Sequence, residues 1–472
     1  MQSVIKFGTD GWRGVIAEDY TFDNVRLCTQ GVAQYLLDTG KAAPGMVVGH
    51  DTRFVSENFA AAAAEVLAGN GIKALLVNKA TPTPVISYAI LAHKTAGAIN
   101  ITASHNPATD NGFKVRSEYA GAAAPETLTE IEKRINQNPT VKRMARAEAI
   151  EKGMIEIFDP APPYLAHLKD MLDIEPIRQA SFNVVVDSMW GAGIGWLKGI
   201  LRGGKITVAE IHAARNPFFP GMHRPEPIAA NLRGLSASVR GRKANAGLAT
   251  DGDADRVGLI DEHGNFVNQL LVYALLAYYL LEVRKQRGAI VKALSTTSML
   301  EKLGQIYNVP VLETGVGFKY VAPKMIESNA MIGGEESGGY AFRGHMPERD
   351  GILASLFILD LMRHTGKTPS ELVQHLFSLV GPHYYDRLDT TFPLQQRAEI
   401  TARMLANPPG VIDGSKVVRV QTDDGFKYHM ADGSWLLIRF SGTEPIMRIY
   451  TETNSPDRVW RIINEGRKLV GV

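Results

Sequence analysis

Residues 47–77, VVGHDTRFVSENFAAAAAEVLAGNGIKALLV, decide the fold class. The apolar run Val47-Val48-Gly49 predicts a short strand, and the alanine-rich segment from Ala60 to Leu67 predicts a helix. A second strand is predicted at Ala74-Leu75-Leu76-Val77. This order is a β-α-β unit, the building block of α/β domains.

The same unit returns twice along the chain. Val184-Val185-Val186 and Ile206-Thr207-Val208 flank one expected helix, and Ile290-Val291 and Val309-Pro310-Val311 flank another. Three α/β units therefore follow one another.

A later apolar segment in each unit ends in a polar, glycine-bearing loop, and these loops contain Ser104, Asp251 and Glu335. Ligands in α/β sheets gather outside the carboxyl ends of strands, so the three loops are expected to share one cleft. The alternative is that the repeat reflects only the ordinary alternation of strands and helices in α/β proteins, without a shared site.

The section after Gly381 changes character. Residues 389–392 and 416–420 predict strands, and a helix closes the chain from Asp457 onward. With 472 residues the chain is too long for one core. We expect an α/β fold of three similar α/β domains plus a smaller C-terminal α+β domain around a central cleft. The expected domains are 1–150, 151–260, 261–380 and 381–472.

Composition excludes several classes of protein. The chain has 51 basic and 49 acidic residues and a net charge of +2, so no global field indicates nucleic acid or an anionic membrane. The one cysteine, Cys28, excludes an internal disulfide and fits a buried hydrophobe. Leu270 to Leu281 is too short to span a bilayer, and residues 1–6 lack a signal-peptide core. We therefore expect a cytoplasmic protein.

The segment 250–256, TDGDADR, carries carboxylates at alternate positions, Asp251, Asp253 and Asp255. In extended or turning backbone they can converge on one hard cation, for which Mg²⁺ is the natural candidate. An EF-hand calcium loop is the competing interpretation, and its twelfth position, Glu262, is acidic. Its sixth position requires glycine but is Arg256, and residues 257–260 continue as a strand, so we reject it. A solvated acidic turn is the other alternative, although Arg256 beside the acids suits a phosphate and a metal better.

The segment 102–107, TASHNP, places the Ser104 hydroxyl at a strand-to-loop turn beside the His105 imidazole. A serine nucleophile needs activation and charge stabilisation. No Gly-x-Ser-x-Gly elbow surrounds Ser104, so an acyl-transfer hydrolase is poorly supported. Taken alone, the motif fits a capping serine as well as a nucleophile.

Two basic residues lie in glycine-containing segments near the N-terminus. Lys114, in Asn111-Gly112-Phe113-Lys114, fits an acid/base role, a phosphate counter-charge or a solvated side chain. Arg13 lies in a glycine-framed turn, where a phosphate contact and a purely structural turn are both plausible.

Two later loops offer groups for a sugar phosphate. In segment 334–339, GEESGG, Glu335 and Ser337 provide acceptors for sugar hydroxyls, and an acidic surface loop is the alternative. Segment 439–445, RFSGTEP, predicts a phosphate nest, with Arg448 as a second contact and an ordinary hairpin turn as the alternative. The nest residues are Arg439, Ser441, Gly442 and Thr443.

These four loops, in this order, resemble the α-D-phosphohexomutase superfamily, and the resemblance spans the whole chain. It implies four domains around a central cleft and an active-site phosphoserine at Ser104. It also implies Mg²⁺ held by a phosphoserine oxygen and by Asp251, Asp253 and Asp255. Arg256 and His105 would then help to hold the transferring phosphoryl group.

Within the superfamily, the Glu335 loop resembles phosphoglucomutases more than phosphomannomutases or phosphoglucosamine mutases, which favours glucose. Segments 314–319 and 345–351 also look phosphoglucomutase-like. Gly339 stands where bifunctional relatives carry histidine, so Lys114 and Lys319 become the better acid/base candidates.

The resemblance implies a mutase that interconverts glucose 1-phosphate and glucose 6-phosphate through a glucose 1,6-bisphosphate intermediate, which also serves as activator. Mutases for mannose or glucosamine phosphate, or a glucose 1,6-bisphosphate synthase, are the near alternatives. A metal-dependent sugar phosphatase and an inactive sugar-phosphate-binding protein are the distant ones. We expect a hexose phosphate as the small-molecule partner, no nucleic acid or membrane, a monomer or weak homodimer, and a last domain hinged near Gly381.

Overall fold

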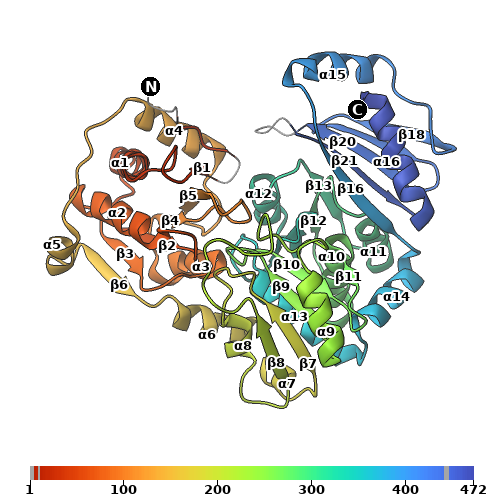
Figure 1. Cartoon of the computed structure of the whole chain (residues 1–472), viewed down its shortest axis with the longest axis horizontal. Helices are drawn as coiled ribbons and strands as arrows, with labels where there is room; N and C mark the ends of the chain where they lie inside the picture. Colours follow the sequence, from red (N-terminus) through yellow and green to blue (C-terminus); the bar gives the residue numbers. More distant parts are fainter. Residues whose placement is uncertain (1–4, 9–10, 441–445, 472) are drawn as a thin grey trace.

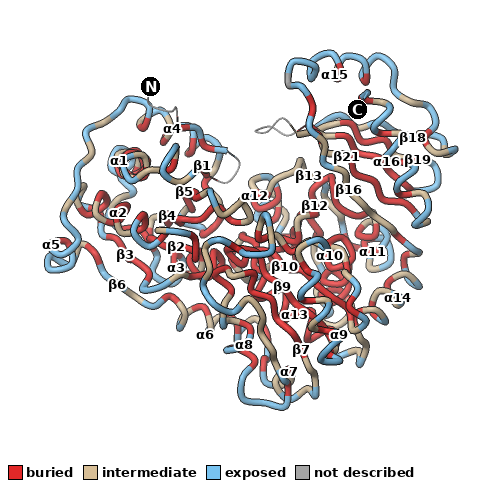
Figure 2. The backbone as a smooth tube through the Cα atoms, viewed as in Figure 1, coloured by how far each residue is buried: buried red, intermediate tan, exposed pale blue. Residues whose placement is uncertain are grey.

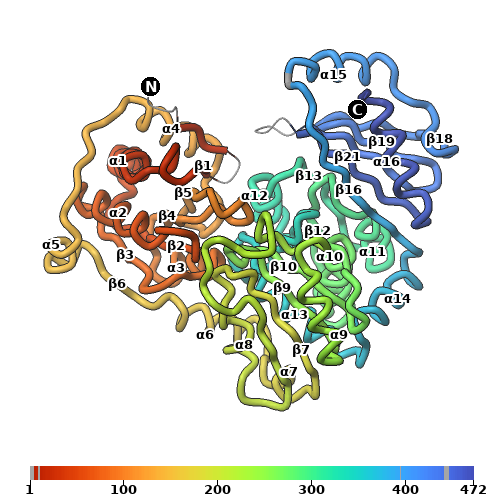
Figure 3. Tube along the Cα trace, in the orientation of Figure 1, coloured from red at the N-terminus to blue at the C-terminus, as the bar shows by residue number. Residues whose placement is uncertain are grey.

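The computed structural model describes residues 5–8, 11–440 and 446–471. Four groups of helices and strands follow one another along an arc, with the first and last groups at its two ends (Figures 1 and 3). Each group is built around one sheet, and the four sheets have six, five, four and six strands.

The first domain contains the decisive β-α-β unit as β2, α2 and β3. Its sheet has the order β1-β5-β4-β2-β3-β6, and β2 lies parallel to both β3 and β4. The strands are β1 (Trp12–Val15), β2 (Met46–His50), β3 (Ala74–Val77), β4 (Gly97–Ile101), β5 (Asp110–Ser117) and β6 (Ile155–Phe158). The helices are α1 (Phe22–Asp38), α2 (Ser56–Gly69), α3 (Thr83–His93), α4 (Pro125–Asn136) and α5 (Arg146–Glu151).

The second domain repeats the parallel core, in the strand order β11-β10-β9-β7-β8. The strands are β7 (Asn183–Asp187), β8 (Thr207–Ile211), β9 (Ala246–Thr250), β10 (Val257–Ile260) and β11 (Phe266–Val267). The helices are α6 (Ala161–Met171), α7 (Glu175–Arg178), α8 (Trp196–Ile200) and α9 (Arg233–Arg242). Residues 257–260 therefore form a strand rather than entering a helix, as the rejection of an EF-hand requires.

The third domain has the strand order β13-β12-β14-β15. The strands are β12 (Ile290–Ala293), β13 (Val311–Thr314), β14 (Ile332–Gly334) and β15 (Tyr340–Phe342). The helices are α10 (Gln269–Tyr278), the π-helical turn η1 (Tyr279–Val283), α11 (Met299–Tyr307), α12 (Phe318–Ser328), α13 (Gly351–Thr365) and α14 (Pro369–Val380).

The last domain has an antiparallel sheet in the order β16-β21-β20-β19-β18-β17. The strands are β16 (Tyr384–Thr391), β17 (Val411–Ile412), β18 (Ser415–Gln421), β19 (Phe426–Met430), β20 (Trp435–Phe440) and β21 (Ile446–Thr453). The helical segments are η2 (Leu394–Gln396), α15 (Arg397–Ala406) and α16 (Pro456–Val470). The expected fold class, three α/β domains and a smaller α+β domain, is confirmed.

The division of the chain at residues 150, 260 and 380 stays a prediction. The strands β6 and β11 continue the first and second sheets a few residues beyond positions 150 and 260.

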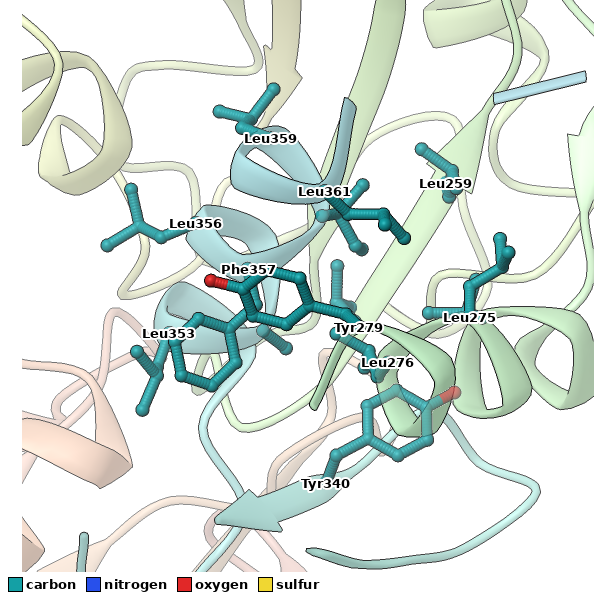
Figure 4. Close-up of a cluster of buried hydrophobic side chains, with 14 of the residues drawn as sticks. Leu259, Leu275, Leu276, Tyr279, Tyr340, Leu353, Leu356, Phe357, Leu359 and Leu361 are labelled. Atoms are coloured by element: carbon teal, nitrogen blue, oxygen red, sulfur yellow. The ribbon is translucent and has the colours of Figure 1, made fainter. Parts of the chain in front are cut away.

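The largest core runs through both the second and the third domain. It includes residues of β7, β9 and β10 together with residues of α10, η1 and α13. Figure 4 shows leucines of α13 beside Leu259 of β10 and Leu275 of α10. The sheets and α13 form the buried interior in Figure 2, whereas α5 and α15 lie at the exposed rim. These two domains therefore share a single hydrophobic core.

The apolar stretch from Leu270 to Leu281 is buried and lies within α10 and η1. In the described part of the chain, no helix combines the length and apolar character needed to cross a bilayer. Cys28 is a buried, unpaired thiol in α1.

A short segment before α13 joins three domains. Met346 is buried in a hydrophobic cluster of the first domain with Val47 and Ile86, and Glu348 pairs with Arg116 of β5. Asp350 caps α13 by accepting hydrogen bonds from the backbone N–H groups of residues 352 and 353. Residues 345–350, which we call the junction segment, thus fix the first domain against the shared core.

Replacing Met346 by alanine should weaken this attachment. The loss of a fully buried side chain should lower the free energy of unfolding by about 2–5 kcal/mol, measured by urea denaturation. Met346→Leu conserves the volume and should cost less than about 1.5 kcal/mol. Equal stability of the alanine variant and the wild type would contradict this role.

Candidate active site

Ser104 lies in a strained turn after β4. Its φ of 51° is in the left-handed region, which non-glycine residues rarely adopt. The Ser104 hydroxyl donates to Asp251 Oδ2 at 3.0 Å, and His105 Nδ1 lies 3.3 Å from the same hydroxyl oxygen. A Cβ atom at Gly252 would lie 2.5 Å from the Ser104 carbonyl oxygen, so the two loops can meet only because residue 252 is glycine. The serine and aspartate loops therefore form one site.

The three aspartates of the second loop converge. Asp251, Asp253 and Asp255 are fully buried, and each offers an oxygen within 4.8 Å of the others. Within the described residues, Asp253 Oδ1 and Asp255 Oδ1 have no hydrogen-bond partner. Buried carboxylate oxygens that lack donors fit Mg²⁺, which takes hard oxygen ligands. The donor set therefore matches the expected cation.

The pKa values of these three carboxyl groups are shifted in different directions. Burial raises the pKa of Asp251 well above its usual value, and the charges of Asp255 and Asp253 raise it further. Burial also raises the pKa of Asp255, although the charge of Arg349 opposes this. For Asp253, the Lys114 ammonium at 3.0 Å and a hydrogen bond from Thr83 outweigh burial and lower the pKa. A bound cation would further offset the repulsion within the triplet.

Positive charge also surrounds the serine loop. Burial lowers the pKa of His105 well below its usual value, and the charges of Arg256, Arg13, Arg224 and Lys114 lower it further. The imidazole is therefore neutral near pH 7, and the cations that face it are suited to a phosphate. Arg13 also donates to the side chain of Asn106 in the serine loop.

Arg53 supports the serine loop and was not predicted from the sequence. Its side chain is fully buried and donates to the backbone carbonyls of Ser104 at 2.7 Å and Asn106 at 2.6 Å. It also donates to the carbonyls of Pro107 and Asp110. The only local signal was an aspartate and an arginine directly after β2, which by itself predicts an ion pair and no more.

Arg349 connects the aspartate loop (residues 250–256) to the Glu335 loop (residues 334–339), and the sequence did not predict this role. Its guanidinium lies 2.8 Å from Asp255 and 3.5 Å from Glu335, and it stacks over the ring of Phe318 at 5.3 Å. A Cβ atom at Gly339 would lie 2.3 Å from Arg349 Cδ. The stem of Arg349 thus occupies the volume that a side chain at position 339 would need.

Glu335, in the loop of residues 334–339, is buried beside this arginine. Burial raises the pKa of Glu335 to about 7, although Arg349 opposes the shift. The Ser337 hydroxyl is buried and has no partner among the described residues. Lys319 lies at the start of α12 with its ammonium over the ring of Tyr320, and no contact in the described residues joins it to Ser104.

The predicted phosphate anchor lies on the last domain. Arg439 of β20 is the cross-strand neighbour of Arg448 of β21, so both point to the same face of the sheet. No contact in the described part of the chain joins either arginine to the serine loop. The other predicted nest residues, Ser441, Gly442 and Thr443, lie outside the described residues.

Models of one family match four successive parts of the chain. Residues 4–142, 162–264 and 268–380 match the alpha/beta/alpha domains I, II and III of phosphoglucomutase/phosphomannomutase, and residues 395–468 match its C-terminal domain.

Individual relatives match nearly the whole chain. A phosphoglucomutase/phosphomannomutase from Thermococcus kodakarensis is 32% identical, with 98% of both chains covered. A protein from Methanothermobacter thermautotrophicus assigned as a phosphoglucosamine mutase is 32% identical, covering 97% of this chain and 96% of the relative. The crystal structure of a Thermus thermophilus protein assigned as a phosphomannomutase superimposes with a TM-score of 0.87, at 37% identity and full coverage of both chains.

The site and the four matched domains define the class: an α-D-phosphohexomutase, which is an isomerase of the intramolecular phosphotransferase type. The chain belongs to the phosphoglucomutase/phosphomannomutase family. Members of this family are in general Mg²⁺-dependent, in agreement with the aspartate triplet.

Replacing Arg53 by lysine should loosen the serine loop, because one ammonium cannot serve four carbonyls. Amide exchange in residues 104–110 should become about tenfold faster. The measurement is hydrogen exchange followed by mass spectrometry. Arg461→Lys, at a side chain that is 57% exposed, is the control and should leave this peptide unchanged. If the amides of residues 104–110 exchange at the same rate in both variants, Arg53 does not support the serine loop.

Proposed function

We propose that the protein interconverts glucose 1-phosphate and glucose 6-phosphate, with the phosphoryl group carried by Ser104. The observation that supports this most directly is the 3.0 Å hydrogen bond from Ser104 Oγ to Asp251 in the aspartate triplet. A serine at this position has both a cation site and a set of positive side chains beside it. Phosphoryl transfer depends mainly on such positioning and charge stabilisation.

In the proposed reaction, the bond between phosphorus and Ser104 Oγ breaks as phosphorus bonds to a free sugar hydroxyl oxygen. That hydroxyl loses its proton to a base, and glucose 1,6-bisphosphate forms. The bisphosphate then turns around, and Ser104 Oγ takes the other phosphoryl group, so no net hydrolysis occurs. Glucose 1,6-bisphosphate supplied from outside would phosphorylate a resting serine and so act as the activator.

Each charged residue at the reacting end has a proposed role. Mg²⁺ held by the three aspartates and an oxygen of the phosphorylated Ser104 would neutralise negative charge on the phosphoryl group. Arg256, Lys114 and Arg13 would stabilise the same charge, and neutral His105 would orient it. Because Lys114 is bound by Asp253, it suits a counter-charge, and Lys319 is left as the acid/base candidate.

The sugar and the far phosphate need separate contacts. The Glu335 carboxylate would accept hydrogen bonds from ring hydroxyls. The Ser337 hydroxyl, which has no partner among the described residues, would donate a hydrogen bond to a ring hydroxyl. Arg439 and Arg448 would anchor the non-reacting phosphate together with Ser441, Gly442 and Thr443. Binding energy from this remote group can be used to orient the reacting end.

A mutase acting on mannose or glucosamine phosphate is the second candidate, because two full-length relatives are assigned to those substrates. Coupled assays with each hexose 1-phosphate, at equal enzyme concentration, separate these possibilities. The highest kcat/KM identifies the substrate.

If Ser104 carries the phosphoryl group, the protein should be phosphorylated at this residue. After incubation with glucose 1,6-bisphosphate, the wild type should gain the mass of one phosphate and Ser104→Ala should not, as intact-mass spectrometry would detect. The alanine variant should lose mutase activity by a factor of about 10³ or more. A wild type that isomerises substrate yet never carries phosphate at Ser104 would exclude the mechanism.

The pKa of about 7 at Glu335 predicts a pH effect on sugar binding. The carboxylate accepts hydroxyl hydrogen bonds best when ionised, so kcat/KM should rise as the pH increases through 7. Glu335→Gln should lower kcat/KM about tenfold or more at pH 8 and remove this rise. Substrate ionisation affects both proteins equally, so the ratio of wild type to variant isolates Glu335. A ratio that is constant from pH 6 to 8 would rule out the assignment.

A further inference from the structure

The turn between β18 and β19 seats the last domain on the third domain. Gln421 and Lys427, at the two sides of this turn, donate to the carboxylate of Glu313 at 2.9 and 3.0 Å. Lys427 also donates to the carbonyl of Leu294, and its side chain is almost fully buried. These contacts join the end of β13 to the hairpin of residues 421–427, which we call the docking hairpin.

Asp424, at the tip of the docking hairpin, binds both domains at once. Its Oδ2 atom accepts a hydrogen bond from the backbone N–H of Val316 at 2.8 Å. Its Oδ1 atom accepts one from Arg439 Nε at 2.9 Å. Val316 lies in the third-domain loop that leads into α12, and Arg439 lies in the last domain. One carboxylate thus links a loop of the third domain to the predicted phosphate anchor.

The contact between Asp424 and Arg439 is suited to orienting the guanidinium group rather than only neutralising its charge. Asp424 contacts the Nε edge of the guanidinium, and no contact in the described residues uses the two terminal nitrogens. The side chains are 16% and 27% exposed for Arg439 and Asp424, so solvent screens the pair only in part. The terminal nitrogens are the edge that binds a phosphate in a bidentate manner.

The neighbouring arginine in the sheet, Arg448, also lies beside an aspartate. Arg448, opposite Arg439, lies 3.7 Å from Asp389, and Asp389 also pairs with Arg387 at 2.8 Å. That acid belongs to the last domain, as do its partners. Asp424 is different because its second oxygen contacts another domain. Asp389 thus holds arginines within one domain, whereas Asp424 holds an arginine of one domain and a backbone N–H of another.

We propose that Asp424 is a positioning residue that couples the seating of the last domain on the third domain to the orientation of Arg439. The inference rests on the proposed function, in which Arg439 anchors the non-reacting phosphate. When the docking hairpin is seated, the Val316 N–H fixes Oδ2 and thereby fixes the oxygen that holds Arg439 Nε. When it is not seated, Arg439 loses this restraint and has more rotamers to lose on binding phosphate.

The test compares Asp424→Ala and Asp424→Asn with Asp423→Asn, a matched control at an exposed acid in the same turn. Kinetics are measured with whichever hexose 1-phosphate the wild type uses, in the presence of Mg²⁺ and glucose 1,6-bisphosphate. We expect Asp424→Ala to raise KM about tenfold or more, with a smaller change in kcat, because a charge-assisted hydrogen bond is lost. Asp423→Asn should leave KM within about twofold.

A double-mutant cycle separates positioning from general structural damage. In an Arg439→Ala background, adding Asp424→Ala should change KM by less than about twofold, because the residue that Asp424 positions is already gone. Full additivity of the two substitutions would overturn the inference. A lower KM in Asp424→Asn would also overturn it, since the carboxylate would then act as a competitor of phosphate.

Hydrogen exchange tests the interdomain half of the inference. In Asp424→Ala, the peptide that contains the Val316 amide should exchange faster, while peptides of the first domain should not change. Unaltered exchange at Val316 would contradict the coupling. Failure of the proposed function has a different signature: the wild type itself would isomerise no hexose phosphate, yet the faster exchange at Val316 would still be expected.

Discussion

Three carboxylates buried within 4.8 Å of one another are the constraint on which the rest of the structure depends. Charges of one sign at this distance in a poorly hydrated site repel strongly, so each must be compensated. Lys114 comes from the first domain and Arg349 from the third, and the Ser104 hydroxyl completes the set. Compensation of the charges of this one loop therefore brings three domains together, and it leaves carboxylate oxygens that could hold a cation beside Ser104.

Hydrophobic packing makes this arrangement rigid. The second and third domains share one core, and the junction segment before α13 inserts Met346 into the first domain. Arg349 belongs to the same segment and contacts both Asp255 and Glu335, and the next residue, Asp350, caps the buried helix α13. Side chains built on rigid elements keep their geometry better than side chains on free loops. The candidate active site is thus supported by the same segment that joins the domains.

The last domain is attached differently. Its own core lies between the antiparallel sheet and the helices α15 and α16, and polar contacts of the docking hairpin link it to the third domain. A smaller apolar cluster, including Leu294 and Trp435, also lies at this boundary. Interfaces of this mixed kind permit movement between domains more readily than a shared core does. This contrast agrees with the expectation that the last domain moves about a hinge near Gly381, which remains a prediction.

The sequence by itself determined the local features: three β-α-β units, an acidic triplet at alternate positions, a serine after a strand, and a final α+β section. Each is built from patterns among near neighbours in the chain, where periodicity and spacing act directly on the backbone. Only the tertiary structure decided which distant charges meet. Arg53 reaches carbonyls 51 to 57 positions away, Lys114 meets Asp253 across 139 positions, and Asp424 meets Val316 across 108. Such pairs leave no periodic trace, because their energy depends on burial and on the packing of whole domains rather than on their neighbours in the chain.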